Sequence, residues 1–180
     1  MQQAHLTTIA PRSDIRLGII APDGRDAMLQ HAEQFKSARI PFVFDPGQGL
    51  PMFDGKELAN FVDLASWITV NDYEGKMLSE RTGWSSVELS RRVQGLIITL
   101  GAEGSEVWIE GEKTVVPPVK ASAVVDPTGC GDAYRGALLY GLEQGWSLVR
   151  CAALGNRIGA LKIAQRGPQN YRLDLSDIGL

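Results

Sequence analysis

The sequence is most informative in one stretch, Val124-Val125-Asp126-Pro127-Thr128-Gly129-Cys130-Gly131-Asp132-Ala133-Tyr134-Arg135-Gly136-Ala137. Its small residues at 129 to 131 let the backbone approach a ligand closely, and they lead directly into an apolar helical pattern. The N–H groups of a first helical turn have no partner inside the helix, and together with the helix dipole they attract anions. The stretch therefore predicts an anion site at the start of a helix.

Asp132 lies at the mouth of this predicted anion site. A carboxylate there would repel a phosphate held in the ground state, but it is well placed to take a proton from a hydroxyl that attacks a phosphoryl group. The alternative is that Asp132 only caps the helix and that the glycines serve a tight turn, because Asp is common at helix starts. From these residues alone both interpretations stay open.

Outward from this stretch, short apolar runs alternate with helical patterns. The clearest strand is Leu96 to Leu100, whose nearly continuous apolar character suits a strand covered on both faces. Further strands are expected at residues 17–20, 41–45 and 67–70, and a hairpin at 106–116. Helices are expected at about 24–38 after a capping Asp23, and at 56–65, 73–81, 86–93, 133–144 and 148–164. This alternation predicts one α/β domain with a mostly parallel sheet and helices on both faces.

Composition narrows the classes of partner. The 180 residues carry a net charge of −3, which argues against nucleic acid or an anionic membrane as the main partner. Two cysteines without a CxxC spacing offer neither a disulfide framework nor a cysteine-built zinc site. No apolar run approaches the ~20 residues of a membrane span, and the opening residues show no secretory signal. We expect a cytoplasmic protein that acts on a small molecule.

Two common nucleotide-binding motifs are excluded by spacing. The interval from Gly49 to Gly55-Lys56 has one residue too many for a P-loop, and no Ser or Thr follows the lysine. The glycines at 129, 131 and 136 resemble a dinucleotide-binding GxGxxG, but the third falls two positions late. This spacing, together with Asp132, disfavours an NAD-dependent oxidoreductase.

Three segments, in order along the chain, carry a resemblance to a known family. Asn71-Asp72-Tyr73-Glu74 resembles an N-x-x-E motif, Thr99-Leu100-Gly101-Ala102-Glu103-Gly104-Ser105 resembles a T-x-G-x-x-G-s nucleotide loop, and Asp126 to Asp132 resembles a C-terminal signature. Together they are similar to the ribokinase-like (PfkB) family of carbohydrate and nucleoside kinases. The stretches Ala21 to Asp26 and Asp45 to Gly49 resemble the bacterial adenosine or broad nucleoside kinase branch.

The resemblance implies a role for each matching residue. It makes Asp132 the catalytic base and the N–H groups of Gly129, Cys130 and Gly131 the anion hole. It also implies ATP and Mg²⁺, and in some relatives a monovalent cation such as K⁺. Asn71 and Glu74 would organise magnesium and phosphate, with Glu74 acting through water. The ATP site would include Thr99, Gly101, Gly104 and Asn156, and the monovalent cation would lie at Asp126 and Thr128. A helix Asn156 bonded to a neighbouring loop is an alternative to its adenine contact.

The resemblance covers only the later part of the family's domain. The first strands, the small β lid and the sugar-gripping motif that family members have are not visible before Leu17, so the chain is expected to be N-terminally truncated. Without these parts the acceptor hydroxyl, of a nucleoside or a sugar, would lack part of its grip. The alternative function is therefore a nucleotide-binding fragment without turnover. A sheet edge left unpaired would favour association, a homodimer among the outcomes.

Overall fold

The computed structural model describes residues 14–174 and 176, so the opening residues, on which the expectation of no secretory signal rests, lie outside the described range. The chain divides into two compact units. Unit 1 comprises Met1–Thr99 and Trp108–Lys113, and unit 2 comprises Leu100–Val107 and Thr114–Leu180. That the two units act as a single domain stays a prediction.

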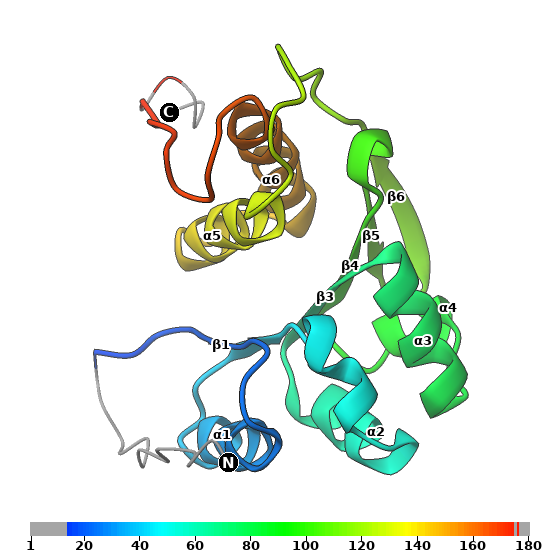
Figure 1. Ribbon diagram of the computed structural model, residues 1–180. Coiled ribbons are helices and arrows are strands. Elements are labelled where there is room, and N and C mark those ends of the chain that lie inside the picture. The colour runs from blue at the N-terminus through cyan, green and yellow to red at the C-terminus, as the bar shows by residue number, and fades with distance from the viewer. Residues whose placement is uncertain (1–13, 175, 177–180) are drawn as a thin grey trace. The chain divides into compact units, whose positions relative to one another are not determined.

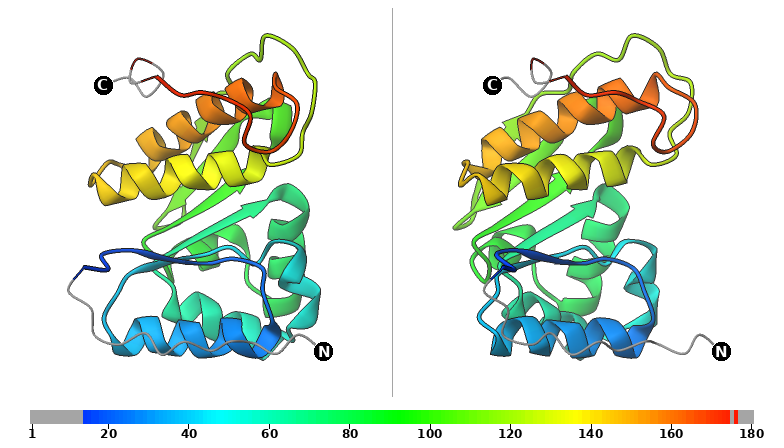
Figure 2. Two further views of the ribbon diagram at one scale, coloured as in Figure 1. Left: turned by 60° about the vertical axis from the view of Figure 1, so that its left-hand side comes forward. Right: turned by 90° about the vertical axis from the view of Figure 1, so that its left-hand side faces the viewer.

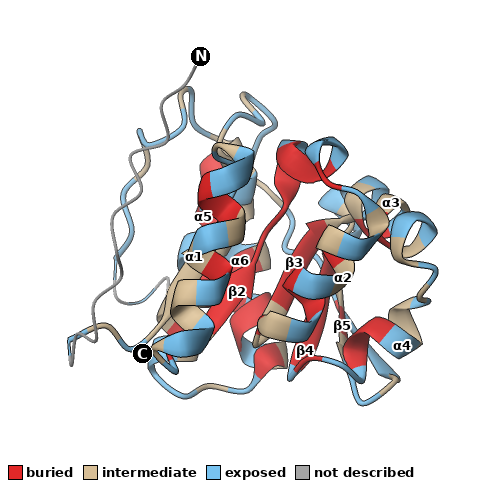
Figure 3. Ribbon diagram, turned by 90° about the horizontal axis from the view of Figure 1, so that it is seen from below, coloured by how far each residue is buried: buried red, intermediate tan, exposed pale blue. Residues whose placement is uncertain are grey.

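A six-stranded sheet in the order β1-β2-β3-β4-β5-β6 forms the framework. Its first four strands are β1 (Gly18–Ile20), β2 (Phe42–Phe44), β3 (Trp67–Asn71) and β4 (Gly95–Thr99), and each pairs with the next in parallel. Burial explains the near-continuous apolar sequences of three of them, since β2 is wholly buried, β3 is buried except at its two ends, and β4 is buried except at Thr99 (Figure 3). The predicted mostly parallel α/β fold is confirmed.

Four helices of unit 1 follow these strands along the chain and lie side by side over one face of them (Figure 1). They are α1 (Arg25–Ser37), α2 (Gly55–Leu64), α3 (Asp72–Thr82) and α4 (Ser86–Ser90), and a 3-10 helix, η1 (Gly47–Met52), precedes α2. The stacked rings of Phe44 and Phe61 have centroids 4.5 Å apart and join β2 to α2. Because β1 to β4 pair in parallel, their carboxyl ends all lie along one edge of unit 1.

Helix starts in unit 1 follow sequence signals with one exception. Reciprocal capping boxes begin α2 at Asp54 and Glu57, α3 at Asn71 and Glu74, and α4 at Ser85 and Glu88. The prediction that Asp23 caps α1 is wrong: the N-cap is Gly24, and the Asp23 carboxylate accepts the Gly24 N–H, at 2.7 Å. The carboxylate bonds one residue too early to satisfy the helix.

The predicted hairpin is confirmed as β5 (Ser105–Ile109) and β6 (Glu112–Val116). Its two connecting residues, Glu110 and Gly111, have φ of 52° and 88°. Positive φ at both central positions is the geometry that matches the right-handed twist of the flanking strands. A short 3-10 turn, η2 (Gly101–Glu103), connects β4 to β5.

Unit 2 is dominated by α5 (Cys130–Glu143) and α6 (Leu148–Ile163), which pack side by side along most of their length (Figure 2). Ala133, Ala137, Leu154 and Ile158 form the core of this pair. Because these residues are small or aliphatic, the two helices approach closely. Helix α5 begins three residues earlier than expected, at Cys130. Among the described residues, no helix is both long enough and apolar enough to cross a membrane.

Candidate active site

The carboxyl ends of two neighbouring strands bring together two of the predicted site residues in unit 1. Asn71 ends β3, Thr99 ends β4, and the two are paired in register. The Thr99 hydroxyl donates to the Val70 carbonyl at 3.4 Å, which turns this side chain toward β3. Ligands of open α/β sheets bind beyond the carboxyl ends of the strands, so this edge fits a ligand site.

Asn71 and Glu74 hold each other at the start of α3. The Glu74 N–H donates to Asn71 Oδ1 at 2.7 Å, and the Asn71 N–H donates to Glu74 Oε2 at 2.8 Å. The N-x-x-E motif is therefore a capping box, like those that begin α2 and α4. Within the described residues Glu74 Oε1 takes part in no hydrogen bond or ion pair, so one carboxylate oxygen stays available to a ligand or its water.

The loop from Thr99 to Gly104 makes a tight turn. The Leu100 N–H donates to the Gly104 carbonyl at 2.8 Å, and Gly101 has a φ of 57°. Gly104 has a φ of 92°, and a Cβ there would lie 2.3 Å from the Val116 carbonyl oxygen. Gly104 is thus fixed by close backbone contact, whereas a Cβ on Gly101 would meet no atom within 4 Å. An open Gly101 backbone suits close approach of a ligand.

The turn before α5 exposes backbone donors in unit 2. Gly129 is the N-cap with a φ of 80°. The Cys130 N–H donates to the Pro127 carbonyl at 3.1 Å. Within the described residues, the N–H groups of Gly129, Gly131 and Asp132 have no hydrogen-bond partner. The turn therefore offers an anion the N–H groups of Gly129, Gly131 and Asp132, with that of Cys130 already engaged.

Asp132 is exposed at the third position of α5. The alternative of a helix cap is not what the structure has, because the N-cap is Gly129 and no side chain caps this helix. In the described part of the chain the Asp132 carboxylate forms no hydrogen bond or ion pair. It is therefore unengaged, on a residue that adjoins the backbone donors of the turn in sequence.

Asp126 is engaged by every one of its polar groups. Its N–H donates to the Ile163 carbonyl at 3.1 Å. Its carboxylate accepts from the Thr128 N–H at 2.9 Å and from the Gly167 N–H at 2.8 Å. Hydrogen bonds from the Gly167 backbone and then from Thr128 lower the pKa of Asp126 to about 2. Lys162 Nζ donates to the Asp126 carbonyl at 2.6 Å. Asp126 thus ties the segment before the turn to the end of α6.

Asn156 of α6 uses its whole amide group within unit 2. Its Nδ2 donates to the carbonyls of Val116 and Pro117 at 3.2 and 3.0 Å, and its Oδ1 accepts from the Ser105 hydroxyl at 3.2 Å. The Tyr134 hydroxyl donates to the same Ser105 oxygen at 3.1 Å, and burial raises the pKa of Tyr134 to about 12. These contacts are the ones that the alternative, an Asn bonded to a neighbouring loop, predicts.

Cys130 and Arg135 flank the turn. Burial raises the pKa of the Cys130 thiol, which lowers its thiolate fraction at neutral pH. A Cβ on Gly131 would lie 2.6 Å from Arg135 Nη1, so the guanidinium of Arg135 covers that part of the turn.

Sequence reasoning missed two residues that support this turn. Lys162 of α6 is completely buried, although lysine side chains are usually exposed. Pro168 packs against Gly129, where a Cβ would lie 2.9 Å from the Pro168 Cα. Neither has a local signal, because both contacts join residues about 40 positions apart; the only hint is a lysine at an otherwise apolar position of the last helix.

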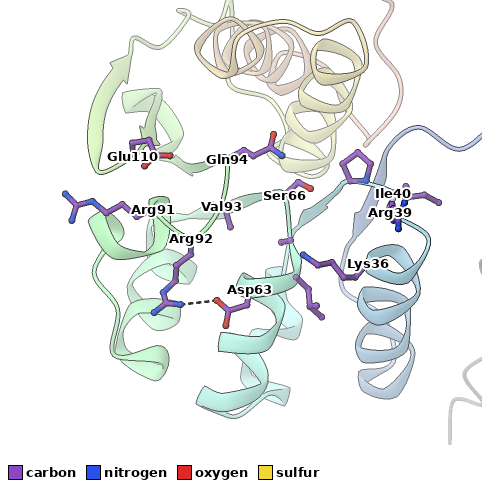
Figure 4. A pocket seen from close by; sticks show the side chains of 13 residues that line it. Lys36, Arg39, Ile40, Asp63, Ser66, Arg91, Arg92, Val93, Gln94 and Glu110 are labelled. Carbon is purple, nitrogen blue, oxygen red and sulfur yellow. Dashed lines mark hydrogen bonds and ion pairs between the residues drawn. The ribbon is translucent and has the colours of Figure 1, made fainter.

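The pocket drawn in Figure 4 lies elsewhere in unit 1. It has a volume of about 510 Å³ and is lined at the amino ends of β2, β3 and β4, by residues such as Pro41, Ser66 and Gln94. Arg92 and Asp63, both on its wall, form an ion pair at 3.1 Å. None of the predicted site residues lines it, so it is separate from the carboxyl edge described above.

The described residues thus combine an α/β fold with a capping box at a strand end, a glycine-rich loop, and an unengaged Asp132 carboxylate in the first turn of α5, whose N-cap is Gly129. The pfkB family of carbohydrate kinases matches residues 13–174, and the chain belongs to that family.

Individual relatives are consistent with this. The chain is 31% identical to a nucleoside kinase of Methanocaldococcus jannaschii over 126 aligned residues. The alignment covers 70% of this chain and 42% of the relative. The chain is 31% identical over 132 residues to an inositol 3-kinase of Arabidopsis thaliana, 73% of this chain and 36% of the relative. The structure of Burkholderia thailandensis nucleoside kinase in complex with inosine superposes with a TM-score of 0.89 at 48% identity, over 93% of this chain and 55% of that one. The chain thus spans about half the length of these relatives or less.

Proposed function

We propose that the chain carries the catalytic portion of an ATP-dependent kinase that transfers the γ-phosphoryl group to a primary hydroxyl of a nucleoside or sugar. The observation that carries the proposal is the turn before α5, where the N–H groups of Gly129, Gly131 and Asp132 lie beside the unengaged Asp132 carboxylate. Phosphoryl transfer asks the protein mainly to position the reactants and to stabilise charge. This turn offers both an anion site and a base.

In this mechanism Asp132 accepts the proton of the acceptor hydroxyl as its oxygen attacks the γ-phosphorus, and the bond from phosphorus to the bridging oxygen of ADP breaks. The backbone donors stabilise the charge that develops on the transferring group. Fixed N–H groups at a helix start need no rearrangement during this step. Thr99, Gly101, Gly104 and Asn156 are assigned to the ATP side, with Asn156 acting through the Val116–Pro117 backbone that it holds.

We assign magnesium binding to Glu74 in unit 1. Among the described residues no group of three or more His, Cys, Asp or Glu is arranged to hold a metal. Mg²⁺ usually keeps several waters and binds through one or two carboxylates plus substrate phosphates. The unengaged Oε1 of Glu74 suits such a contact, through water, and Asn71 holds Glu74 in place. When bound, the metal would neutralise charge on the phosphates.

The acceptor class that we favour is a nucleoside. The similar Burkholderia thailandensis enzyme is described in complexes with inosine and with ADP and inosine. At 48% identity over 93% of this chain it carries more weight for this assignment than the inositol 3-kinase of 31% identity. Adenosine and inosine are therefore the first acceptors to test, followed by ribose and inositol.

The test is release of ADP from ATP and Mg²⁺ with each acceptor, for wild type and for Asp132→Asn. A positioned base typically contributes about 10²–10⁴-fold, so Asp132→Asn lowers turnover by at least that order while ATP still binds. Glu143→Gln, at the exposed far end of the same helix, is the control and keeps wild-type turnover. Near-normal turnover of Asp132→Asn removes this residue from its role.

The length of the chain supplies the second candidate function. Because the chain spans about half of its relatives, it can bind nucleotide without holding an acceptor. Binding of ATP by calorimetry with no ADP release for any acceptor would favour this nucleotide-binding fragment.

A further inference from the structure

Lys162 is a buried charge at the point where the segment before the anion turn meets the end of α6. Its side chain has an exposed fraction of 0%. Its Nζ donates to the Asp126 carbonyl at 2.6 Å and to the Gln165 carbonyl at 3.2 Å. A buried ammonium is costly unless carbonyl or carboxylate oxygens replace its water. The two carbonyls therefore form a site for a cation, and that cation is the ammonium of Lys162.

The ammonium is held by the same kind of ligand, backbone carbonyl oxygen, that binds monovalent cations in proteins. Carbonyl oxygens replace the hydration shell of K⁺ in selective protein sites, and Lys162 is held by two of them. Hydrogen bonds from Gly167 and Thr128 account for most of the lowering of the pKa of Asp126, and the positive charge of Lys162 adds to it.

The same contacts leave Asp126 and Thr128 unsuited to a free cation. Both carboxylate oxygens of Asp126 already accept N–H groups, from Thr128 and Gly167, and its carbonyl accepts from Lys162. A cation placed there would have to share these oxygens with their present donors and would be repelled by the Lys162 ammonium. The residues present therefore do not fit the K⁺ that the family resemblance implies.

We propose that the Lys162 ammonium takes the place of a monovalent cation in unit 2 and holds the segment that leads into the Gly129–Asp132 turn. Lys162 is a positioning residue: it acts through the Asp126 backbone and touches no reacting atom. Its consequence for stability is independent of the kinase function, whereas its consequence for turnover rests on the proposed function. The chain is then insensitive to K⁺, both in its folding and in its activity.

The test compares thermal unfolding of the 180-residue chain in KCl, NaCl and tetramethylammonium chloride, each at about 0.1 M so that general screening is equal. The wild-type midpoint is the same in all three salts. Lys162→Ala lowers the midpoint in tetramethylammonium chloride by on the order of 5 °C or more, because buried oxygens lose their partner. K⁺ restores part of that loss by entering the space left by the ammonium. Lys76→Ala, which removes an exposed lysine of α3, shows neither effect.

Each result decides the proposal. A saturable rise of the wild-type midpoint with K⁺ overturns it, since the site would then take a free cation. So does a folded Lys162→Ala that is as stable as wild type or that does not respond to K⁺. If Lys162→Ala folds in no salt, Lys162→Met, which keeps the stem packed, must be destabilised equally in all salts, and the wild-type titration remains decisive. Turnover that is equal in K⁺ and tetramethylammonium supports the proposal, while absence of turnover bears only on the kinase function.

Discussion

Gly129 packs directly against Pro168, so closely that a Cβ on the glycine would lie 2.9 Å from the Pro168 Cα and 3.1 Å from its carbonyl oxygen. The same glycine has a φ of 80°, a conformation that costs an L-residue about 1–2 kcal/mol. Gly129 is the N-cap of α5, so both constraints act at the residue that aims the backbone donors of the turn. The glycine is required by space and by backbone angle at once.

Gly129→Ala therefore destabilises the chain and disrupts the turn. The strain of about 1–2 kcal/mol alone lowers the unfolding midpoint by about 2–8 °C in a chain of this size, and displacement of Pro168 adds to it. Gly136→Ala is the matched control: it lies in the same helix, nothing is within 4 Å of its Cβ position, and it gains about 0.5–1 kcal/mol from helix propensity. Thermal unfolding of both variants checks this, and a Gly129→Ala chain as stable as Gly136→Ala contradicts it.

Substitutions at Asn71 and at Glu74 distinguish the structural role of this capping box from its proposed role in binding Mg²⁺. Asn71→Ala removes the acceptor of the Glu74 N–H and costs about 0.5–2 kcal/mol of stability. Glu74→Gln keeps an oxygen for the Asn71 N–H and loses only the charge, so its stability changes by less than about 1 kcal/mol. On the proposed function, Glu74→Gln raises the Mg²⁺ concentration needed for half-maximal turnover.

The box at Ser85 and Glu88 is a control for this assignment. It has the same reciprocal hydrogen bonds at the start of α4, and no role is proposed for it. Glu88→Gln should match Glu74→Gln in unfolding and leave the Mg²⁺ dependence of turnover unchanged. An equal effect of both substitutions on that dependence would show that the Asn71–Glu74 pair only starts a helix.

The strands and most helices could be predicted from sequence because their signals are local. Residues 96–100 read as a covered strand, and β4 spans Gly95–Thr99. The start of α5 could not be placed, because Gly129 has no capping side chain and a Cys-Gly pair is a poor helix signal, yet the helix begins at Cys130.

The candidate site was predictable in its residues but less so in their contacts. Asp132 and its glycines stand out in the sequence, whereas the hydrogen bond from the Cys130 N–H to the Pro127 carbonyl depends on the turn geometry. The cation site expected at Asp126 and Thr128 could not be judged without Lys162, which lies 36 residues away from Asp126 in the sequence. Long-range contacts of this kind leave no periodic pattern.

The two thiols should differ in their reaction with iodoacetamide. Burial raises the pKa of Cys151 from an ordinary 9.0 to about 11, and its side chain is fully buried. Cys130 has a raised pKa from the same cause, but it is half-buried. Because the thiolate is the reactive form, both react slowly at pH 7, Cys130 becomes alkylated as the pH rises, and Cys151 reacts only on unfolding. Mass spectrometry of the alkylated peptides measures this, and rapid labelling of Cys151 in the folded chain contradicts it.

The raised pKa of Cys151 also sets a sign for stability. Between pH 9 and 11 the unfolded chain loses this proton and the folded chain keeps it, so stability conferred by the neutral thiol is present below pH 9 and is lost as pH rises toward about 11. Cys151→Ala flattens that part of the decline in the unfolding midpoint, and Cys130→Ala changes it less. A wild-type and a Cys151→Ala chain with equal slopes over this range would contradict the assignment.

Asn156 is the residue at which a structural and a nucleotide-binding role can be told apart most sharply. Its amide hydrogens are both donated to carbonyls of Val116 and Pro117, so none is left for a base edge in this arrangement. Asn156→Ala leaves two carbonyls and the Ser105 hydroxyl without their partner and costs about 1–3 kcal/mol of stability. Affinity for ATP, measured by calorimetry well below the unfolding midpoint, should fall by less than about tenfold, or 1.4 kcal/mol. Gln169→Ala, an exposed polar residue of unit 2, is the control for both readouts. A tenfold or greater loss of affinity at wild-type stability would instead make Asn156 a direct contact of the nucleotide.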